Sequence, residues 1–61
     1  MKHLSNGVYF GESAAETGEI EGRGVIFYHT GKIFEGHFRN GLRSGLGYEE
    51  YPDHSFYLGN F

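Results

Sequence analysis

The sequence predicts an all-β protein: an antiparallel meander of β-hairpins, about two and a half repeats long, in a single elongated sheet. Two observations support this prediction. Apolar and polar residues alternate along several short stretches, and glycines recur among aromatic residues at a fixed spacing. Helix is disfavoured because glycine interrupts every stretch of three turns, apart from a poor candidate around SAAET at 13–17.

A repeat becomes visible when the sequence is shifted by 23 residues, the spacing from Gly22 to Gly45. Upstream, Tyr9 begins the same pattern but lies 25 residues before Phe34. We place the two extra residues in the loop SAAETG at 13–18, since loops tolerate insertions. The shift pairs Gly22 with Gly45, Gly24 with Gly47, Tyr28 with Tyr51, Phe34 with Tyr57, Gly36 with Gly59, and Phe38 with Phe61.

Five strands follow from the alternation, at about 8–12, 22–28, 33–39, 45–51 and 55–61. In the third of them, Phe34, Gly36 and Phe38 share one face. The segment RNGLRSG at 39–45 has the composition of a turn, so the fourth strand is expected to open at Gly45. Shorter turns, HTGK at 29–32 and YPDHS at 51–55, are predicted between successive hairpins.

Glycines at alternating positions have a geometric reason in such a sheet. Without a Cβ atom they leave slots on one face, and an aromatic ring can lie across each slot. Repeating that contact builds a continuous core from hairpins that would be marginal alone. The predicted repeat core consists of Tyr9, Gly11, Gly22, Gly24, Tyr28, Phe34, Gly36, Phe38, Gly41, Gly45, Gly47, Tyr51, Tyr57, Gly59 and Phe61.

The pattern Phe34-x-Gly36-x-Phe38-x-x-Gly41-x-x-x-Gly45-x-Gly47 resembles the MORN repeat (membrane occupation and recognition nexus). The resemblance covers residues 7–61, as repeats at about 9–31 and 34–54 and a partial repeat at 57–61, after an N-terminal segment 1–6. There are three departures from the pattern. Ser13 stands at the second aromatic position of the first unit, His54 replaces the glycine found at 31, and Glu49 replaces Ile26 on the glycine face.

Composition excludes several classes of function. The chain has no cysteine, which rules out disulfides and thiolate zinc sites, and its net charge of −3 does not favour nucleic acid. Residues 1–20 lack the apolar core of a signal peptide, and no apolar run is long enough to cross a bilayer. We therefore expect an intracellular, cytoplasmic protein.

No catalytic, cofactor or metal site is expected. Gly22-x-Gly24 and Gly45-x-Gly47 lack the helix N-terminus that a phosphate loop needs, so they are interpreted as structural. The glutamates are expected to be solvated, and no nucleophile has an adjacent base. The histidines have no local metal-ligand spacing and are interpreted as solvated surface groups: His3, His29, His37 and His54.

A second apolar patch is predicted on the face opposite the glycines. Exposed patches of this kind usually mark an interaction site. The alternative is that the N-terminal segment MKHLS folds over part of the patch. The predicted partner-binding residues are Val25, Phe27, Ile33, Tyr48, Phe56 and Leu58.

These features predict a non-catalytic docking module that binds other protein chains through this patch and through strand addition at 55–61. The alternative for 55–61 is that this strand, the first of an unfinished third unit, continues into further repeats. The MORN resemblance implies scaffolding in cilia, flagella or other cytoskeletal assemblies, or at membrane-apposed structures. It also implies two alternatives: a peripheral module that binds acidic phospholipid headgroups, and a targeting appendage of a longer protein. The candidate lipid contacts are Arg23, Lys32, Arg39 and Arg43.

Overall fold

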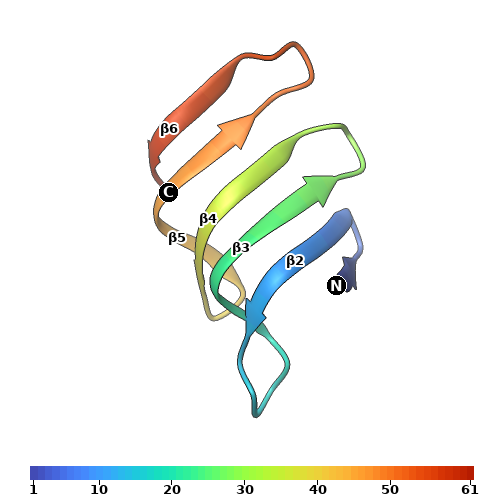
Figure 1. Ribbon diagram of the computed structural model, residues 1–61, viewed down its shortest axis with the longest axis vertical. Coiled ribbons are helices and arrows are strands. Elements are labelled where there is room, and N and C mark those ends of the chain that lie inside the picture. Colours follow the sequence, from blue (N-terminus) through green and yellow to red (C-terminus); the bar gives the residue numbers. More distant parts are fainter.

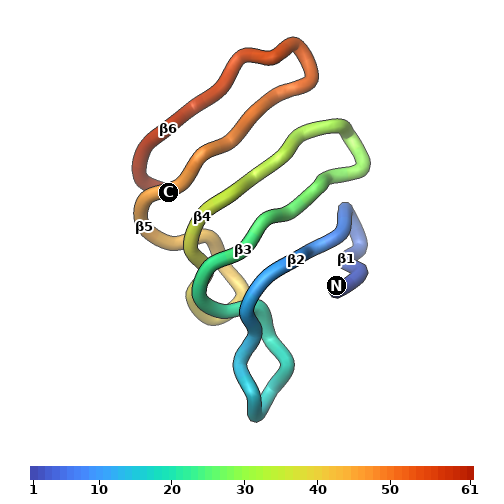
Figure 2. Tube along the Cα trace, viewed as in Figure 1, coloured from blue at the N-terminus to red at the C-terminus, as the bar shows by residue number.

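A computed structural model describes all 61 residues as one antiparallel sheet of six strands in the order of the chain (Figure 1). The tube in Figure 2 shows each strand lying beside the next as an uninterrupted meander. Every regular element is a strand, so there is no helix that could span a membrane. The strands are β1 (Lys2–Leu4), β2 (Gly7–Ser13), β3 (Ile20–Tyr28), β4 (Ile33–Arg39), β5 (Leu42–Glu50) and β6 (Phe56–Asn60).

The predicted all-β meander is confirmed, and the five expected strands are present as β2 to β6. The sixth strand, β1, was missed. It pairs with β2 through Lys2–Tyr9, His3–Val8 and Leu4–Gly7 after a turn at residues 5–6. The alternation in Lys-His-Leu, followed by the turn residues Ser5 and Asn6, could have predicted this strand.

The turn between β4 and β5 is shorter than the turn predicted from the segment RNGLRSG at 39–45. Asn40 and Gly41 both have positive φ, 53° and 79°, the combination that a two-residue type I′ turn requires. Strand β5 therefore begins at Leu42 rather than Gly45. The residues of β5 that were expected in the turn form a bulge instead. Gly36 pairs with Gly47 and Phe38 pairs with Arg43, so β5 contains extra residues between these two pairs.

The bulge is repeated one period earlier in the β2–β3 hairpin. There Gly11 pairs with Gly24, and the register shifts before Ser13 reaches Ile20. The positive-φ residue in each bulge is the first glycine of a Gly-x-Gly pair, Gly22 (φ 80°) or Gly45 (φ 72°). The two hairpins therefore share the same irregularity as well as the same strands, which is the structural form of the sequence repeat.

The second glycine of each pair belongs to a row that crosses five strands. Gly36 lies between Gly24 of β3 and Gly47 of β5, and the row runs Gly11, Gly24, Gly36, Gly47, Gly59. A Cβ atom added to Gly36 would lie 2.9 Å from the Gly47 Cα and 2.9 Å from the Phe34 Cζ. The rings therefore lie against the glycine row, as the slot argument predicts.

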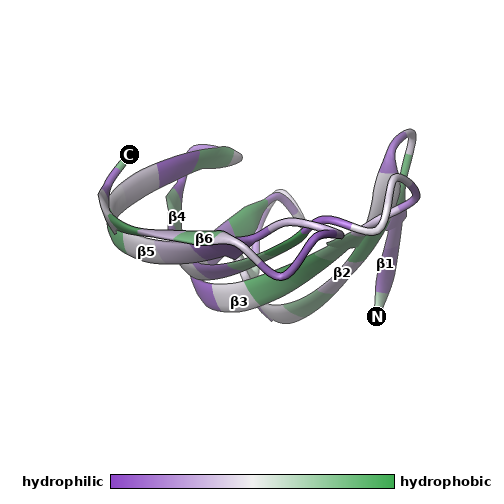
Figure 3. Ribbon diagram, turned by 90° about the horizontal axis from the view of Figure 1, so that it is seen from above, coloured by the Kyte–Doolittle hydropathy of each residue, from purple (hydrophilic) through white to green (hydrophobic).

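The core occupies one face of the sheet, hereafter the core face. Phe34 is fully buried and meets Phe38 and Phe61 edge to face, with ring centroids 5.3 and 4.9 Å apart. The sheet is thin, 37 × 22 × 13 Å, and curved (Figure 3). The buried apolar residues are Tyr9, Ile20, Ile26, Phe34 and Phe38, with Leu4, Tyr28 and Phe61 packed against them.

The turns that join the hairpins also repeat. In the first, Gly31 (φ 95°) donates its N–H to the Tyr28 carbonyl; in the second, His54 (φ 72°) donates to the Tyr51 carbonyl. His54 thus adopts a left-handed conformation that costs a residue with a Cβ atom about 1–2 kcal/mol. The exposed His54 side chain contributes only a 3.7 Å approach of its Nδ1 to Glu50.

We predict that His54→Gly stabilises the protein by about 0.5–1 kcal/mol, because relief of the strain exceeds the added chain entropy of glycine. Thermal unfolding followed by circular dichroism should show a midpoint several degrees higher. Gly31→Ala is the matched control and should lower the midpoint. An unchanged midpoint in both variants would show that these turns carry no strain.

Candidate functional site

The face opposite the core, hereafter the second face, carries apolar side chains on every strand from β2 to β6. Two rows cross the strands in register: Val8, Phe27, Ile33, Glu50, Phe56, and Phe10, Val25, Glu35, Tyr48, Leu58. The eight uncharged members are hereafter the apolar band. Its aromatic side chains form two pairs, Phe10 with Phe27 (5.7 Å) and Tyr48 with Phe56 (5.6 Å).

Several side chains of the apolar band are exposed to solvent. Phe56 and Leu58 retain 61% and 65% of their accessible surface, and Phe10 and Phe27 retain 46% each. All six residues that the sequence predicted for partner binding lie in this band. Val8 and Phe10 were not predicted, although their alternation with Tyr9 and Gly11 in the first repeat places them on the second face.

A hollow of about 410 Å³ borders the apolar band on the second face. It spans β3 to β6 along the glycine row, between Val25, Tyr48 and Leu58 on one side and Leu46 on the other. Leu46, 61% exposed, is a further apolar side chain that the sequence interpretation did not include. The polar side chains that line this hollow are Arg23, Glu35 and His37.

The N-terminal segment does not cover the second face. Strand β1 extends the sheet beside β2, and Leu4 packs against the core cluster. The alternative that MKHLS folds over the patch is therefore wrong. A strand adds to the sheet edge because its backbone groups pair there, whereas a face offers only side chains.

Two carboxylates lie within the rows of the apolar band. Glu35 is exposed and pairs across the strands with Val25 on one side and Tyr48 on the other. Glu50 accepts a 2.7 Å hydrogen bond from the Tyr48 hydroxyl, which raises the pKa of Tyr48 above its ordinary value. Both carboxylates therefore present negative charge in the middle of an apolar surface.

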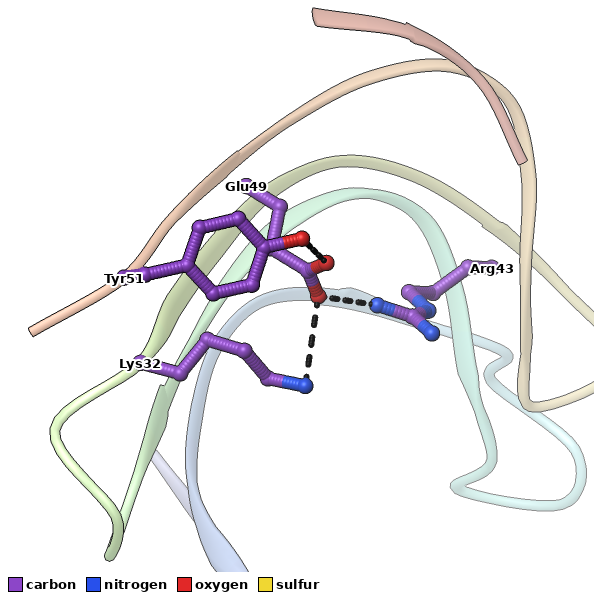
Figure 4. Close-up of polar contacts among 4 residues, drawn as sticks. All are labelled: Lys32, Arg43, Glu49 and Tyr51. Carbon is purple, nitrogen blue, oxygen red and sulfur yellow. Dashed lines mark hydrogen bonds and ion pairs between the residues drawn. The ribbon is translucent and has the colours of Figure 1, made fainter. Parts of the chain in front are cut away.

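One acidic side chain is buried on the core face, and the expectation that the glutamates are solvated is wrong for it. Glu49 is 6% exposed, in the cross-strand row where Ile26 stands one repeat earlier, between Phe34 and Tyr57. Figure 4 shows its carboxylate inside the arc of the sheet with Arg43, Lys32 and Tyr51 pointing toward it. The contacts are Arg43 Nη1 at 2.5 Å, Tyr51 Oη at 2.8 Å and Lys32 Nζ at 3.4 Å.

These partners keep Glu49 ionised. Burial alone would raise its pKa, but hydrogen bonds from Tyr51 and Arg43 and the charges of Arg43 and Lys32 outweigh burial and lower the pKa below the ordinary 4.5. The hydrogen bond to Glu49 raises the pKa of the Tyr51 phenol in turn. Arg43 also lies over Phe34 and Phe61, 5.2 and 5.0 Å from the ring centroids.

The four candidate lipid contacts do not form one basic surface. Lys32 and Arg43 are held by Glu49 on the core face. Arg23 and Arg39 lie on the second face, where Arg23 pairs with His37 and Arg39 with Leu42. The cations are thus divided between opposite faces of the sheet, a division that follows from strand alternation.

The core face has a hollow of its own, about 440 Å³, between the N-terminal hairpin and the β4–β5 turn. Leu4, Ile20 and Phe38 line it, and Glu19 is its only carboxylate. Ser5 also lines this hollow, but the lining has no histidine to activate its hydroxyl and no second carboxylate, so it does not assemble a hydrolytic site. No group of three or more His, Asp and Glu side chains lies close enough to hold a metal ion.

Most residues predicted for the repeat core are buried or partly buried, lie in bulges or a turn, or belong to the glycine row, but the prediction is wrong for Tyr57, which is 47% exposed. Tyr9, Phe34, Phe38 and Gly47 are buried, and Tyr28, Tyr51 and Phe61 are partly buried. Gly22, Gly41 and Gly45 occupy bulges and a turn rather than the core. Tyr9 and Tyr57 share one feature, because each donates its hydroxyl to the carbonyl three residues on, at 2.5 and 3.2 Å. Gly11, Gly24, Gly36 and Gly59 complete the glycine row.

The stacked hairpins, with the same bulge and the same turn one period apart, define a β-repeat protein. Residues 34–56 match the family model of the MORN repeat. The match begins at Phe34 in β4, includes the Asn40-Gly41 turn and all of β5, and ends at the first residue of β6. Residues 34–56 are therefore similar to a MORN repeat. Comparisons with curated proteins and with solved structures find no match.

Proposed function

We propose that this chain is a non-catalytic docking module that binds another protein through its second face. The observation that supports the proposal most strongly is the apolar band, eight side chains that cross five strands opposite a core that is already complete. Contiguous exposed apolar surfaces on proteins usually mark sites of interaction with another molecule. Burial stabilises a complex by about 25 cal/mol per Å² of apolar surface, before the cost of association.

The outer edge of β6 adds a second mode of binding. The strand pairs with β5 on one side only, and no lysine or proline within Phe56–Asn60 protects the other side. Its free N–H and C=O groups can accept a strand from another chain. Phe56 and Leu58 lie on this strand, so a partner bound at the edge would also reach the apolar band.

Binding of acidic phospholipid headgroups is the second candidate. Arg23 and Arg39 on the second face support it, whereas Lys32 and Arg43 are engaged by Glu49. Two cations beside Glu35 and Glu50, in a chain of net charge −3, make a weak site for an anionic surface. We therefore rank protein docking first. A place in a cytoskeletal or ciliary assembly, or beside a catalytic domain, is part of the proposal and rests on the MORN repeat.

Photo-crosslinking tests the proposal and separates the two candidates. A photoreactive amino acid at Leu58 of the full-length protein in cells should give protein adducts that are discrete in mass. The matched control is the same residue at Ala15, which lies in the exposed β2–β3 loop and should give none. Lipid adducts at Leu58, or equal labelling at both sites, would contradict protein docking.

A further inference from the structure

We infer that the occupant of the second face is an amphipathic α-helix of a partner protein that places two basic side chains, one turn apart, over Glu35 and Glu50. This inference rests on the proposed docking function and specifies the chemistry of the partner. It combines three features of the second face: its lack of free backbone groups, the dimensions of the apolar band and the position of the two carboxylates.

The first feature selects the backbone conformation of the occupant. The face of a sheet presents side chains only, because the N–H and C=O groups of β2 to β5 pair with neighbouring strands. A segment that covers the apolar band must therefore satisfy its own backbone hydrogen bonds, and a single segment does so as an α-helix. An extended peptide could pair only at the β6 edge.

The dimensions of the apolar band agree with a short helix. Five strands spaced about 4.8 Å apart make a band roughly 19 Å across. A helix of about 13 residues has the same length at 1.5 Å per residue. Such a helix would contact the band through an apolar stripe at positions i, i+3, i+4 and i+7.

The carboxylates determine the charge of the occupant. Glu35 has no hydrogen-bond or ion-pair partner within the chain, and Glu50 is held only by the Tyr48 hydroxyl and by the distant His54. Covering ionised carboxylates with apolar groups is costly unless a cation pairs with them. A Lys or Arg on the occupant supplies that partner and discriminates against acidic or neutral helices.

The register gives the spacing of those cations. Glu50 pairs with Ile33, so Glu35 and Glu50 are diagonal neighbours on adjacent strands. Diagonal positions are about 7–8 Å apart, and residues one turn apart on a helix are about 5–6 Å apart at Cβ. Two basic side chains at i and i+4, or at i and i+3, can therefore reach both carboxylates at once.

The same carboxylates argue against the other occupants. A second copy packed on this face would bring its own Glu35 and Glu50 into the interface and bury four like charges. An anionic membrane would be repelled by the same two groups, and Arg23 and Arg39 on this face offset that charge without exceeding it. A basic helix is the occupant for which both the apolar band and its carboxylates are favourable.

Two synthetic peptides test the inference. Both are 14-residue helices with the same leucine stripe, and they differ only in two flanking residues one turn apart, Lys in one and Glu in the other. Fluorescence anisotropy at physiological salt should show that the Lys peptide binds at least tenfold more tightly. Glu35→Gln/Glu50→Gln should remove that preference, whereas Glu16→Gln/Glu19→Gln, with the same change in net charge outside the second face, should retain it.

The remaining outcomes separate the inference from the proposed function. Equal binding of both peptides, lost in Phe27→Ser/Leu58→Ser, would overturn the charge inference and leave protein docking intact. A preference that persists in Glu35→Gln/Glu50→Gln would also overturn it. If the wild-type chain self-associates in sedimentation and Phe27→Ser/Leu58→Ser abolishes the association, the second face binds a second copy. If the wild-type chain binds anionic vesicles and the same double substitution abolishes the binding, the second face binds a membrane. Failure to bind either peptide would overturn the inference, and crosslinking at Leu58 would then decide the proposed function separately.

Discussion

Gly36→Val is expected to unfold the protein. The new Cβ atom would lie 2.9 Å from the Gly47 Cα, and the Phe34 ring closes the other side at the same distance. Neither can withdraw, because Gly47 is backbone within the sheet and Phe34 is fully buried. Overpacking of this kind costs about 3 kcal/mol at the upper end of its usual range. A chain of 61 residues has a total stability of roughly 3–9 kcal/mol, so the substitution removes from about a third to all of it and unfolds a protein at the lower end of that range.

Thermal and urea unfolding measured by circular dichroism would test this prediction. His37→Val is the matched control, because it introduces the same side chain one position along β4 on the exposed second face. We expect the control to keep the wild-type midpoint within a few degrees. A Gly36→Val midpoint equal to that of His37→Val would show that the glycine row leaves room for a side chain.

Arg43→Met is expected to destabilise the protein by about 2–3 kcal/mol at neutral pH, since it leaves a buried carboxylate without its closest cation. Lys32 and Tyr51 still contact Glu49, which keeps the loss below that of a fully unpaired charge. Arg39→Met on the second face is the control, and it should change the free energy of unfolding by less than about 0.5 kcal/mol. Urea unfolding of the two variants at pH 7 provides the comparison.

The destabilisation should depend on pH in a defined direction. In the wild type the pKa of Glu49 is lowered, so its contribution to stability is present above 4.5 and is lost as the pH falls through the folded-state pKa. In Arg43→Met the hydrogen bond and the charge of Arg43, two of the causes that lower this pKa, are gone, so the carboxylate is protonated more easily. The difference between the two proteins should therefore shrink below about pH 4.5. A difference that grows on acidification would contradict the assigned ion pair.

Much of the fold could be predicted because the repeat is local. The spacing from Gly22 to Gly45 shows that the same strand pattern occurs twice. The alternation of Phe34, Gly36 and Phe38 determines which face of β4 is buried. The β5 boundary could not be read from composition, because the residues after Asn40-Gly41 could extend a turn or form a bulge. Backbone φ values at Asn40, Gly41 and Gly45 decide between them.

The polar part of the core could not be predicted. Glu49 follows the alternation to the core face, and a buried carboxylate is acceptable only if cations meet it there. Lys32 precedes β4, and Arg43, which pairs with Phe38, is separated from Glu49 by the β5 bulge, so their approach to Glu49 depends on the curvature and the register shift. Neither property is encoded in residue spacing. The second face, in contrast, followed from alternation alone on β3 to β6.

The central claim is that the two faces have separate roles: the core face holds the fold, and the second face is free for a partner. The most direct test is the thermal midpoint of Phe56→Ser/Leu58→Ser, which removes two apolar side chains that are 61% and 65% exposed. The claim predicts a midpoint within a few degrees of the wild type, because little buried surface is lost. A fall of more than about 10 °C, equivalent to more than 1–2 kcal/mol in a domain of this size, would show that the second face belongs to the folded core.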